Sequence, residues 1–327
     1  MTKRFISVAS VALLTLALVP AAASAQDEDK IKIGFLPGVI DPFYQVMELG
    51  VNAAAAEYGI DVITQVPDQW GPTIQAPILD ALVARGDLDC IITAPTDKEQ
   101  MIAPLQFALE SGLSIVTVDT FLGDGDYVNG PVTFPLSYIG SDNVEGGRIA
   151  ARALAESLGG EGTAYIQNTN EGASTTEQRS EGFRAGIEEF PGIEIVGEDY
   201  NLDDENTAVT QTSAKLQVEP DLGGIFGVNV FSAQGAGNAV INAGLGGVVD
   251  VIAFDATIRA MELMEEGVVS LVIAQKPFDM GYMGVQYCVA NADGVTSLPT
   301  RVTTGYAVIT PENRDDPEVA RFIYNVD

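Results

Sequence analysis

The sequence predicts an α/β protein built from parallel sheets, and the order of its apolar segments carries that prediction. Short apolar runs alternate with longer helix-like segments along nearly the whole chain after residue 30. Most of these runs are continuously apolar, as expected for strands that are buried on both faces of a parallel sheet. We expect eleven strands, at residues 31–36, 61–66, 89–93, 114–118, 136–139, 163–167, 194–196, 224–228, 249–254, 270–274 and 305–309.

The predicted helices have recognisable ends. Two helix starts have the spacing of a capping box, Asp142 with Glu145 and Ser174 with Glu177. Eleven strands are more than one sheet of ordinary size holds, so we expect two similar lobes. No low-complexity linker separates them, which favours lobes joined by several chain crossings. The helices stop at glycines, which readily adopt the left-handed conformation that ends a helix: Gly59, Gly86, Gly112, Gly159, Gly244 and Gly267.

The first 25 residues have the pattern of an export signal. Two basic residues precede an apolar stretch at residues 5–19, and Ala23-Ser24-Ala25 matches the small-residue cleavage pattern. The apolar stretch is short for a membrane-spanning helix, and no second one follows it. We therefore expect residues 1–25 to be removed after Ala25 and the mature chain to be a soluble protein of the periplasm.

The composition excludes several classes of function. The chain has no histidine, which removes Ser-His-Asp and Cys-His catalysis and the most common metal ligand. Its formal net charge of −30 would repel the phosphates of a nucleic acid. We predict no catalytic residue, no cofactor and no nucleic-acid partner.

One acidic stretch has part of the spacing of a calcium-binding loop. Its sixth position holds Asp204 instead of the required glycine, and its twelfth position holds Thr210 instead of glutamate. In so acidic a chain such an alternation arises by chance, and we predict no metal site. The alternating residues are Asp199, Asn201, Asp203 and Glu205.

The chain has two cysteines, Cys90 and Cys288. An oxidising compartment permits a disulfide between them. Cys90 opens an apolar strand and Cys288 lies in a predicted helix, and nothing in the sequence brings the two together. We expect buried free thiols, since cysteine packs well as a small apolar residue.

Asp41-Pro42-Phe43-Tyr44 stands where the first predicted strand gives way to the first predicted helix. In open α/β sheets, ligands bind beyond the carboxyl ends of the strands. A carboxylate beside two aromatic rings suits a sugar there, because the acid accepts hydroxyl hydrogen bonds and the rings cover the C–H face. The same residues also suit a structural role, with Asp41 as the helix cap, Pro42 at the first helical position and both rings in the core.

Four more planar polar side chains follow other predicted strands. Carboxylates and amides at such positions match the neighbouring hydroxyls of a sugar. Any one of them could be a turn residue, but five at one edge, counting Asp41, favour a binding site. Arg179 lies on the first turns of its helix, where it could donate to a sugar oxygen or be a solvated helix charge. The four residues are Asp119, Asn229, Asp255 and Gln275.

Eight short segments occur in an order and at a spacing that match one known family along almost the whole mature chain. From Ile31 onward, the chain resembles the periplasmic sugar-binding proteins of the ribose-binding type, which are the receptors of ABC sugar transporters. The matching segments are Asp41-Pro42-Phe43-Tyr44, Pro95-Thr96-Asp97, Val118-Asp119, residues 139–150, Arg179-Ser180-Glu181-Gly182-Phe183, Asn229, Ala253-Phe254-Asp255 and Ile273-Ala274-Gln275.

The resemblance implies two Rossmann-like lobes with parallel sheets. The N-terminal lobe would hold residues 30–141 and 276–304, and the C-terminal lobe would hold residues 142–275 and 305–327. Three chain crossings would join the lobes, near Ser141, Gln275-Lys276 and Thr304-Gly305.

The resemblance also implies a ligand site and a mode of action. In that family the lobes close over a sugar by hinge motion, and the closed form docks on a membrane permease. The residues of this chain that match the family's sugar cleft are Asp41, Phe43, Tyr44, Asp119, Arg179, Asn229, Asp255 and Gln275.

The chain departs from the ribose-binding pattern at several places. Asp41 stands where ribose binders have asparagine, and Thr120 stands where they have arginine. Near Tyr200, no residue clearly matches an aromatic of the family's cleft. The pocket therefore has one more acid and one fewer base than the pocket of a ribose binder. The only tryptophan, Trp70, is a further candidate, since its loop could reach the cleft mouth, although the ring could instead fill that loop.

We therefore predict a receptor that binds a monosaccharide or polyol between two lobes and delivers it to the permease of an ABC transporter. We expect it to act as a monomer. Two other functions remain open at this point: a receptor that reports its sugar to a signalling kinase, and an enzyme that uses paired carboxylates on a glycoside.

Overall fold

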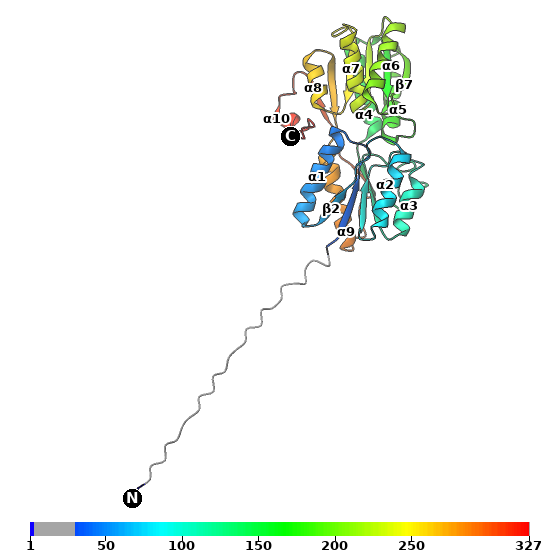
Figure 1. The fold of residues 1–327 in the computed structure, drawn as a ribbon. Coiled ribbons are helices and arrows are strands. Elements are labelled where there is room, and N and C mark those ends of the chain that lie inside the picture. Colours follow the sequence, from blue (N-terminus) through cyan, green and yellow to red (C-terminus); the bar gives the residue numbers. More distant parts are fainter. Residues whose placement is uncertain (3–29, 327) are drawn as a thin grey trace. The chain divides into compact units, whose positions relative to one another are not determined.

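The computed structural model describes residues 1–2 and 30–326, and from Ile31 on the chain forms one compact unit. The export signal predicted at residues 1–25, with its cleavage site, lies outside the described residues except for its first two. Within the compact unit, strands and helices alternate along the sequence (Figure 1).

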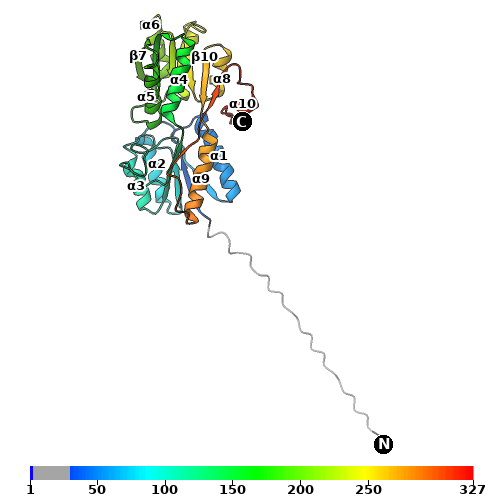
Figure 2. The same ribbon diagram turned by 180° about the vertical axis from the view of Figure 1, so that it is seen from behind.

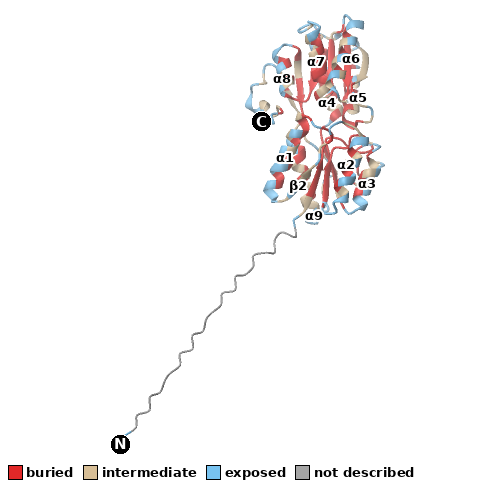
Figure 3. Ribbon diagram, in the orientation of Figure 1, coloured by how far each residue is buried: buried red, intermediate tan, exposed pale blue. Residues whose placement is uncertain are grey.

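The described strands form two six-stranded sheets, which confirms the predicted α/β class. The first sheet has the order β11-β5-β4-β3-β1-β2, with β1 (Lys32–Leu36), β2 (Asp61–Thr64), β3 (Cys90–Thr93), β4 (Ser114–Val118), β5 (Ser137–Gly140) and β11 (Arg301–Thr303). The second sheet has the order β12-β10-β9-β8-β6-β7, with β6 (Glu161–Asn168), β7 (Gly192–Tyr200), β8 (Gly224–Gly227), β9 (Asp250–Phe254), β10 (Val269–Ala274) and β12 (Ala307–Ile309). All pairs are parallel except β10 with β12. Strands β3, β5 and β8 are buried along their whole length, as their apolar runs predicted (Figure 3).

Helices pack against both sheets. At the first sheet these are α1 (Pro42–Tyr58), α2 (Pro72–Ala84), α3 (Ile102–Glu110) and α9 (Pro277–Ala292). At the second sheet these are α4 (Asn143–Ser157), α5 (Ser174–Ile187), α6 (Glu205–Val218), α7 (Val230–Asn242) and α8 (Ile258–Glu265). Helices α1 and α9 are neighbours although most of the chain separates them, and both views show them side by side (Figures 1 and 2). The short helix α10 (Pro317–Ala320) follows the last strand.

The chain passes between the two sheets three times, as expected. It leaves the first sheet after β5 at Ser141 and returns to it after β10 at Gln275 and Lys276. It crosses again between β11 and β12, at residues 304–306.

The third crossing corrects one predicted strand. We expected a strand at residues 305–309, but β12 begins only at Ala307, and the unpredicted strand β11 precedes it. Arg301 and Thr303 of β11 are exposed at the sheet edge, so this strand has no apolar run that would reveal it.

The two predicted capping boxes have different outcomes. Asp142 caps α4 as predicted and accepts a hydrogen bond from the Glu145 amide at 3.1 Å, whereas the Glu145 carboxylate of the predicted box accepts from Arg152. The prediction for Ser174 is wrong, because Ala173 is the cap residue of α5 and the Ser174 hydroxyl accepts from the Phe121 amide at 3.1 Å instead. The six glycines that were expected to end helices all have positive φ.

The expectation of free thiols is also wrong. Cys90 on β3 and Cys288 on α9 form a disulfide, with their Cα atoms 5.9 Å apart. Helix α9 packs on β3, which brings together two residues that are 198 positions apart in the sequence. Because that packing is a property of the folded chain, no local pattern around either cysteine could reveal the pair.

Removing the disulfide should destabilise the protein strongly. The link closes a long loop, and such links contribute about 2–5 kcal/mol. We expect the double variant Cys90→Ala/Cys288→Ala to lose about that much unfolding free energy, measured by circular dichroism in urea. A reductant should produce a similar loss in the parent and no change in the variant, whereas equal stability of parent and variant would contradict the disulfide.

Candidate functional site

A cavity lies where the carboxyl ends of strands from both sheets meet, and it collects seven of the nine predicted binding residues. Arg179 and Gln275 are not among its lining residues. The predicted residues that line it are Asp41, Phe43, Tyr44, Trp70, Asp119, Asn229 and Asp255. The lining is completed by Val39, Thr169, Ala173, Thr175, Thr176 and Asp203.

Asp41 combines the two roles that its sequence position suggested. It is the cap residue of α1, where its Oδ1 accepts from the Tyr44 amide at 2.8 Å and Pro42 takes the first helical position. The Phe43 and Tyr44 rings meet edge to face, with their centroids 5.0 Å apart, and both belong to the buried core. The helix start therefore holds a carboxylate and two rings at the cavity wall.

Asp119 and Asp255 occupy equivalent positions in the two sheets. Each directly follows a strand, β4 or β9, and each has the left-handed backbone that is unusual outside glycine, with φ of 59° and 76°. The Asp119 amide donates to the carbonyl of Ile139 on β5, and the Asp255 amide donates to the carbonyl of Ile273 on β10, both at 2.9 Å. The same local turn therefore places a carboxylate at the cavity from each sheet.

Arg179 is buried, with 2% of its side chain exposed, so its alternative as a solvated helix charge is wrong. Its Nε donates to Asn143 Oδ1 and its Nη1 to the Val228 carbonyl, both at 2.9 Å. The guanidinium lies 3.9 Å from the centroid of the Phe254 ring, and Nη1 is 3.9 Å from Asp255 Oδ2. Arg179 thus lies against one of the cavity carboxylates.

Gln275, at the second crossing, supports the Asp255 carboxylate. Its Nε2 donates to Asp255 Oδ1 at 2.9 Å, and its Oε1 accepts from the Ser141 hydroxyl at 2.8 Å. Since Ser141 belongs to the first crossing, Gln275 connects two of the three crossings to a cavity residue.

Asp203 also lines the cavity, although in the sequence it belongs only to the acidic alternation that resembles part of a calcium loop. Its Oδ1 accepts from Asn229 Nδ2 at 2.7 Å, while Asn229 Oδ1 caps α7 by accepting from the Ser232 amide at 3.0 Å. Asp203 and the preceding Leu202 both have φ of 58°, so two left-handed residues turn the chain toward the cavity after β7. The sequence feature that could have revealed Asp203 as a cavity residue is the polar segment, residues 201–205, that directly follows β7. Among the described residues, no group of His, Cys, Asp and Glu side chains suits a metal ion.

Trp70 reaches the cavity through a close approach to the backbone. A Cβ atom on Gly38 would lie 2.4 Å from the Trp70 ring and 2.7 Å from the Tyr44 hydroxyl. Only glycine therefore leaves room at this position for both aromatic side chains. The ring is partly buried and packs against the core.

Four carboxyl groups share the cavity, and burial is the main reason that the pKa of each is raised. Burial raises the pKa of Asp119 and of Asp203 to about 6, and it raises the pKa of Asp41 well above its ordinary value. Repulsion from neighbouring carboxylates adds to this effect. The Arg179 guanidinium acts in the opposite direction and lowers the pKa of Asp119 and Asp255.

The carboxylates leave the cavity rich in hydrogen-bond acceptors. In Asp41, Asp119 and Asp203, one oxygen accepts from the protein and the other has no partner in the described part of the chain. Two buried donors near the site, Trp70 Nε1 and Arg179 Nη2, are also unpaired. Such a cavity suits a ligand that donates several hydrogen bonds and accepts fewer.

The family model for the periplasmic binding protein domain matches residues 33–296. This chain belongs to the periplasmic binding protein family. The match includes all strands of both sheets except the edge strands β11 and β12. It begins one residue after the start of β1, at Ile33. No helix of the described residues is long and apolar enough to cross a membrane.

This periplasmic binding protein is similar to transport receptors for sugars. It is 27% identical over 283 residues to the ribose import binding protein RbsB of Haemophilus influenzae, covering 86% of this chain and 91% of the relative. It is 43% identical to an Agrobacterium vitis ABC transporter solute-binding protein bound with alpha-D-tagatopyranose, with a TM-score of 0.88 and coverage of 90% and 100% of the two chains. A second Agrobacterium vitis protein, with bound D-fucose, is 26% identical, with a TM-score of 0.84 and coverage of 90% and 100%. The resemblance to ribose-type sugar-binding proteins is thereby confirmed, and these relatives are binding proteins of transporters rather than enzymes.

Asp203 should make the stability of the unliganded protein depend on pH. Its folded-state pKa of about 6 lies above the unfolded value of about 4, so the folded state binds this proton more tightly. The contribution of Asp203 to stability should therefore be fully present below about pH 4 and be lost, by about 2–3 kcal/mol in all, as the pH rises from there through about 6. Urea unfolding across this range should show a flatter dependence for Asp203→Asn than for the parent.

A matched control is Asp61→Asn, which changes an exposed carboxylate at the start of β2. This variant should keep the pH dependence of the parent. A curve for Asp203→Asn that runs parallel to the parent's would contradict the buried, proton-binding state of Asp203.

Proposed function

We propose that this chain is an extracytoplasmic receptor that binds a neutral monosaccharide or polyol in the cavity and delivers it to the permease of an ABC transporter. The observation that carries this proposal is the set of carboxylate oxygens without partners. A monosaccharide has a hydroxyl on most of its carbons, and each hydroxyl donates one hydrogen bond. The Phe43 and Tyr44 rings supply apolar surface for the C–H groups of such a ligand.

The proteins that resemble this chain support the same class of ligand. The two Agrobacterium vitis structures hold alpha-D-tagatopyranose and D-fucose, and RbsB is named for ribose. All three are monosaccharides with several hydroxyls. The additional acid at Asp41, where ribose binders have asparagine, makes a sugar other than ribose the expected ligand.

Ligand binding closes two lobes in this proposal. One lobe comprises residues 30–141 and 276–304, and the other comprises residues 142–275 and 305–327. The three crossings act as the hinge, and the sugar favours the closed form because only that form contacts it from both sides. The lining of one cavity by residues of both sheets supports this motion.

The proposed receptor works outside the cytoplasm. Residues 1–25 direct export and are removed after Ala25, and the mature protein acts as a monomer in the periplasm. The family membership and the name of the import binding protein among its relatives support this location and a permease as partner.

A thermal-shift screen of the chain from residue 26 tests the function. The panel comprises D-tagatose, D-fucose, D-ribose, D-allose, D-arabinose and ribitol. A tight ligand stabilises the folded state by several kcal/mol at saturation, so at least one compound should raise the melting temperature clearly. No shift with any member of the panel would overturn the proposed function.

Asp255→Ala should bind the selected sugar about 10- to 100-fold more weakly than the parent. The change removes a carboxylate from the cavity, and hydrogen bonds to charged groups contribute about 1.5–3 kcal/mol. Calorimetric titration would measure the loss. Asp250→Ala, at the opposite end of β9, should bind like the parent, and unchanged affinity of Asp255→Ala would exclude Asp255 from the site.

Glu177→Gln should weaken sugar binding about two- to fivefold without changing the cavity. Glu177 on α5 forms an ion pair with Lys98, which follows β3, and the Lys98 amide donates to the Gly172 carbonyl at 3.1 Å. These contacts join the two proposed lobes, so losing the ion pair should favour the open form by about 0.5–1 kcal/mol, the usual size for a partly exposed pair.

Titrations at low and high salt measure this effect, because salt screens the ion pair in the parent but has nothing to screen in the variant. Glu181→Gln is the matched control, since Glu181 lies exposed on the same helix and forms no ion pair in the described structure. Equal affinities of parent and Glu177→Gln at low salt would show that the ion pair does not contribute to closure.

A further inference from the structure

The C-terminal segment, residues 310–326, returns to the candidate site after β12. Near its end, Tyr324 forms a parallel bridge with Thr257, and the Tyr324 amide donates to the Ala256 carbonyl at 2.8 Å. Only 2% of Tyr324 is exposed. The Tyr324 side chain is therefore buried inside the protein, next to the turn that follows β9.

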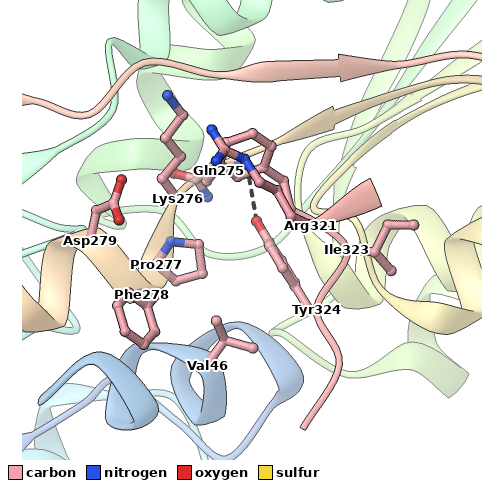
Figure 4. A pocket seen from close by; sticks show the side chains of 10 residues that line it. Val46, Gln275, Lys276, Pro277, Phe278, Asp279, Arg321, Ile323 and Tyr324 are labelled. Carbon is pink, nitrogen blue, oxygen red and sulfur yellow. Dashed lines mark hydrogen bonds between the residues drawn. The ribbon is translucent and has the colours of Figure 1, made fainter. Parts of the chain in front are cut away.

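The Tyr324 hydroxyl holds one of the cavity carboxylates. It donates to Asp255 Oδ1 at 3.0 Å. It also accepts from the backbone amide of Gln275 at 3.0 Å, and this second contact is the one drawn in Figure 4. The same Oδ1 also accepts from Gln275 Nε2 at 2.9 Å. Two donors on one oxygen fix the rotation of the carboxyl group and leave its Oδ2 beside Arg179.

Tyr324 also contacts the opposite wall of the cavity. Its ring meets the Phe43 ring edge to face, with the centroids 5.9 Å apart. Phe43 lies on α1, whereas Asp255 follows β9 and Gln275 belongs to the second crossing. One side chain from the end of the chain thus connects three parts of the site.

We propose that Tyr324 is a positioning residue for sugar binding, which orients the Asp255 carboxylate and ties that orientation to the C-terminal segment. Tyr324 does not line the cavity, so it acts through Asp255 rather than by contact with the sugar. This inference rests on the proposed function, because it concerns the same ligand.

The same segment contains a matched control residue. Phe322 lines a second cavity, and the Lys276 and Arg321 cations lie 5.1 and 4.7 Å from its ring centroid. Neither of these ring contacts involves Asp255. Phe322→Leu therefore changes aromatic packing in the segment but removes no hydrogen bond to the Asp255 carboxylate.

The first test compares Tyr324→Phe and Phe322→Leu with the parent. The probe is D-tagatose, or the panel sugar with the largest thermal shift if D-tagatose gives none. Fluorescence of Trp70, the only tryptophan, reports binding up to high millimolar sugar. Tyr324→Phe keeps the ring and removes the donor, so we expect about five- to tenfold weaker binding, with Phe322→Leu within twofold of the parent.

A double-mutant cycle separates positioning from general loosening of the structure. Tyr324→Phe should have little further effect in an Asp255→Ala background and its full effect in an Asp203→Ala background, because the hydroxyl donates to Asp255, whereas Asp203 is bonded to Asn229. Equal losses in the two backgrounds, or affinity of Tyr324→Phe within twofold of the parent, would overturn the inference. A parent protein that binds no sugar of the panel would instead overturn the proposed function.

Circular dichroism of each unliganded variant shows whether it is folded at the temperature of the titration. If Tyr324→Phe is not folded there, the cycle is measured at a lower temperature at which all variants are folded. The comparison between the two backgrounds then decides the inference in the same way.

Discussion

The burial of several carboxylates beside one arginine is the constraint on which the rest of the site depends. An ionised carboxylate is costly to bury without partners, and Arg179 is the one cation paired with any of the four in the described structure. The fold meets this requirement by giving every carboxylate at least one donor. The Tyr44 amide and hydroxyl, Asn229, Gln275 and Tyr324 all serve this purpose. The remaining free oxygens make the cavity an acceptor of hydrogen bonds, which is the property that favours a sugar.

The parallel sheets explain why these groups meet. All strands of a parallel sheet direct their carboxyl ends to one edge, and the two sheets present those edges to the same cavity. Asp119 and Asp255 repeat one arrangement, with a left-handed residue directly after a strand and an amide bonded to the next strand. The site is therefore assembled from equivalent positions of two similar folding units.

Support for the site extends well beyond its lining. Asp255 is held by Gln275 at the second crossing and by Tyr324 from the C-terminal segment, while Ser141 at the first crossing bonds to Gln275. The segments that connect the two sheets therefore also orient a cavity carboxylate. A change in the path of these crossings would alter the direction of that carboxylate, which gives a physical link between the lobes and the ligand site.

Local patterns were enough to predict the class of fold, most of the strands and seven of the residues that line the cavity, because apolar runs and polar residues at strand ends are local properties of the chain. Asp41 is the clearest case, since one helix start specifies both the cap and the carboxylate. Long-range packing, by contrast, sets the Cys90–Cys288 disulfide, the hydrogen-bond partner of Ser174 and the position of Asp203 at the cavity. Each of these depends on which distant segments meet, and that is set by packing across the whole fold rather than by any nearby pattern.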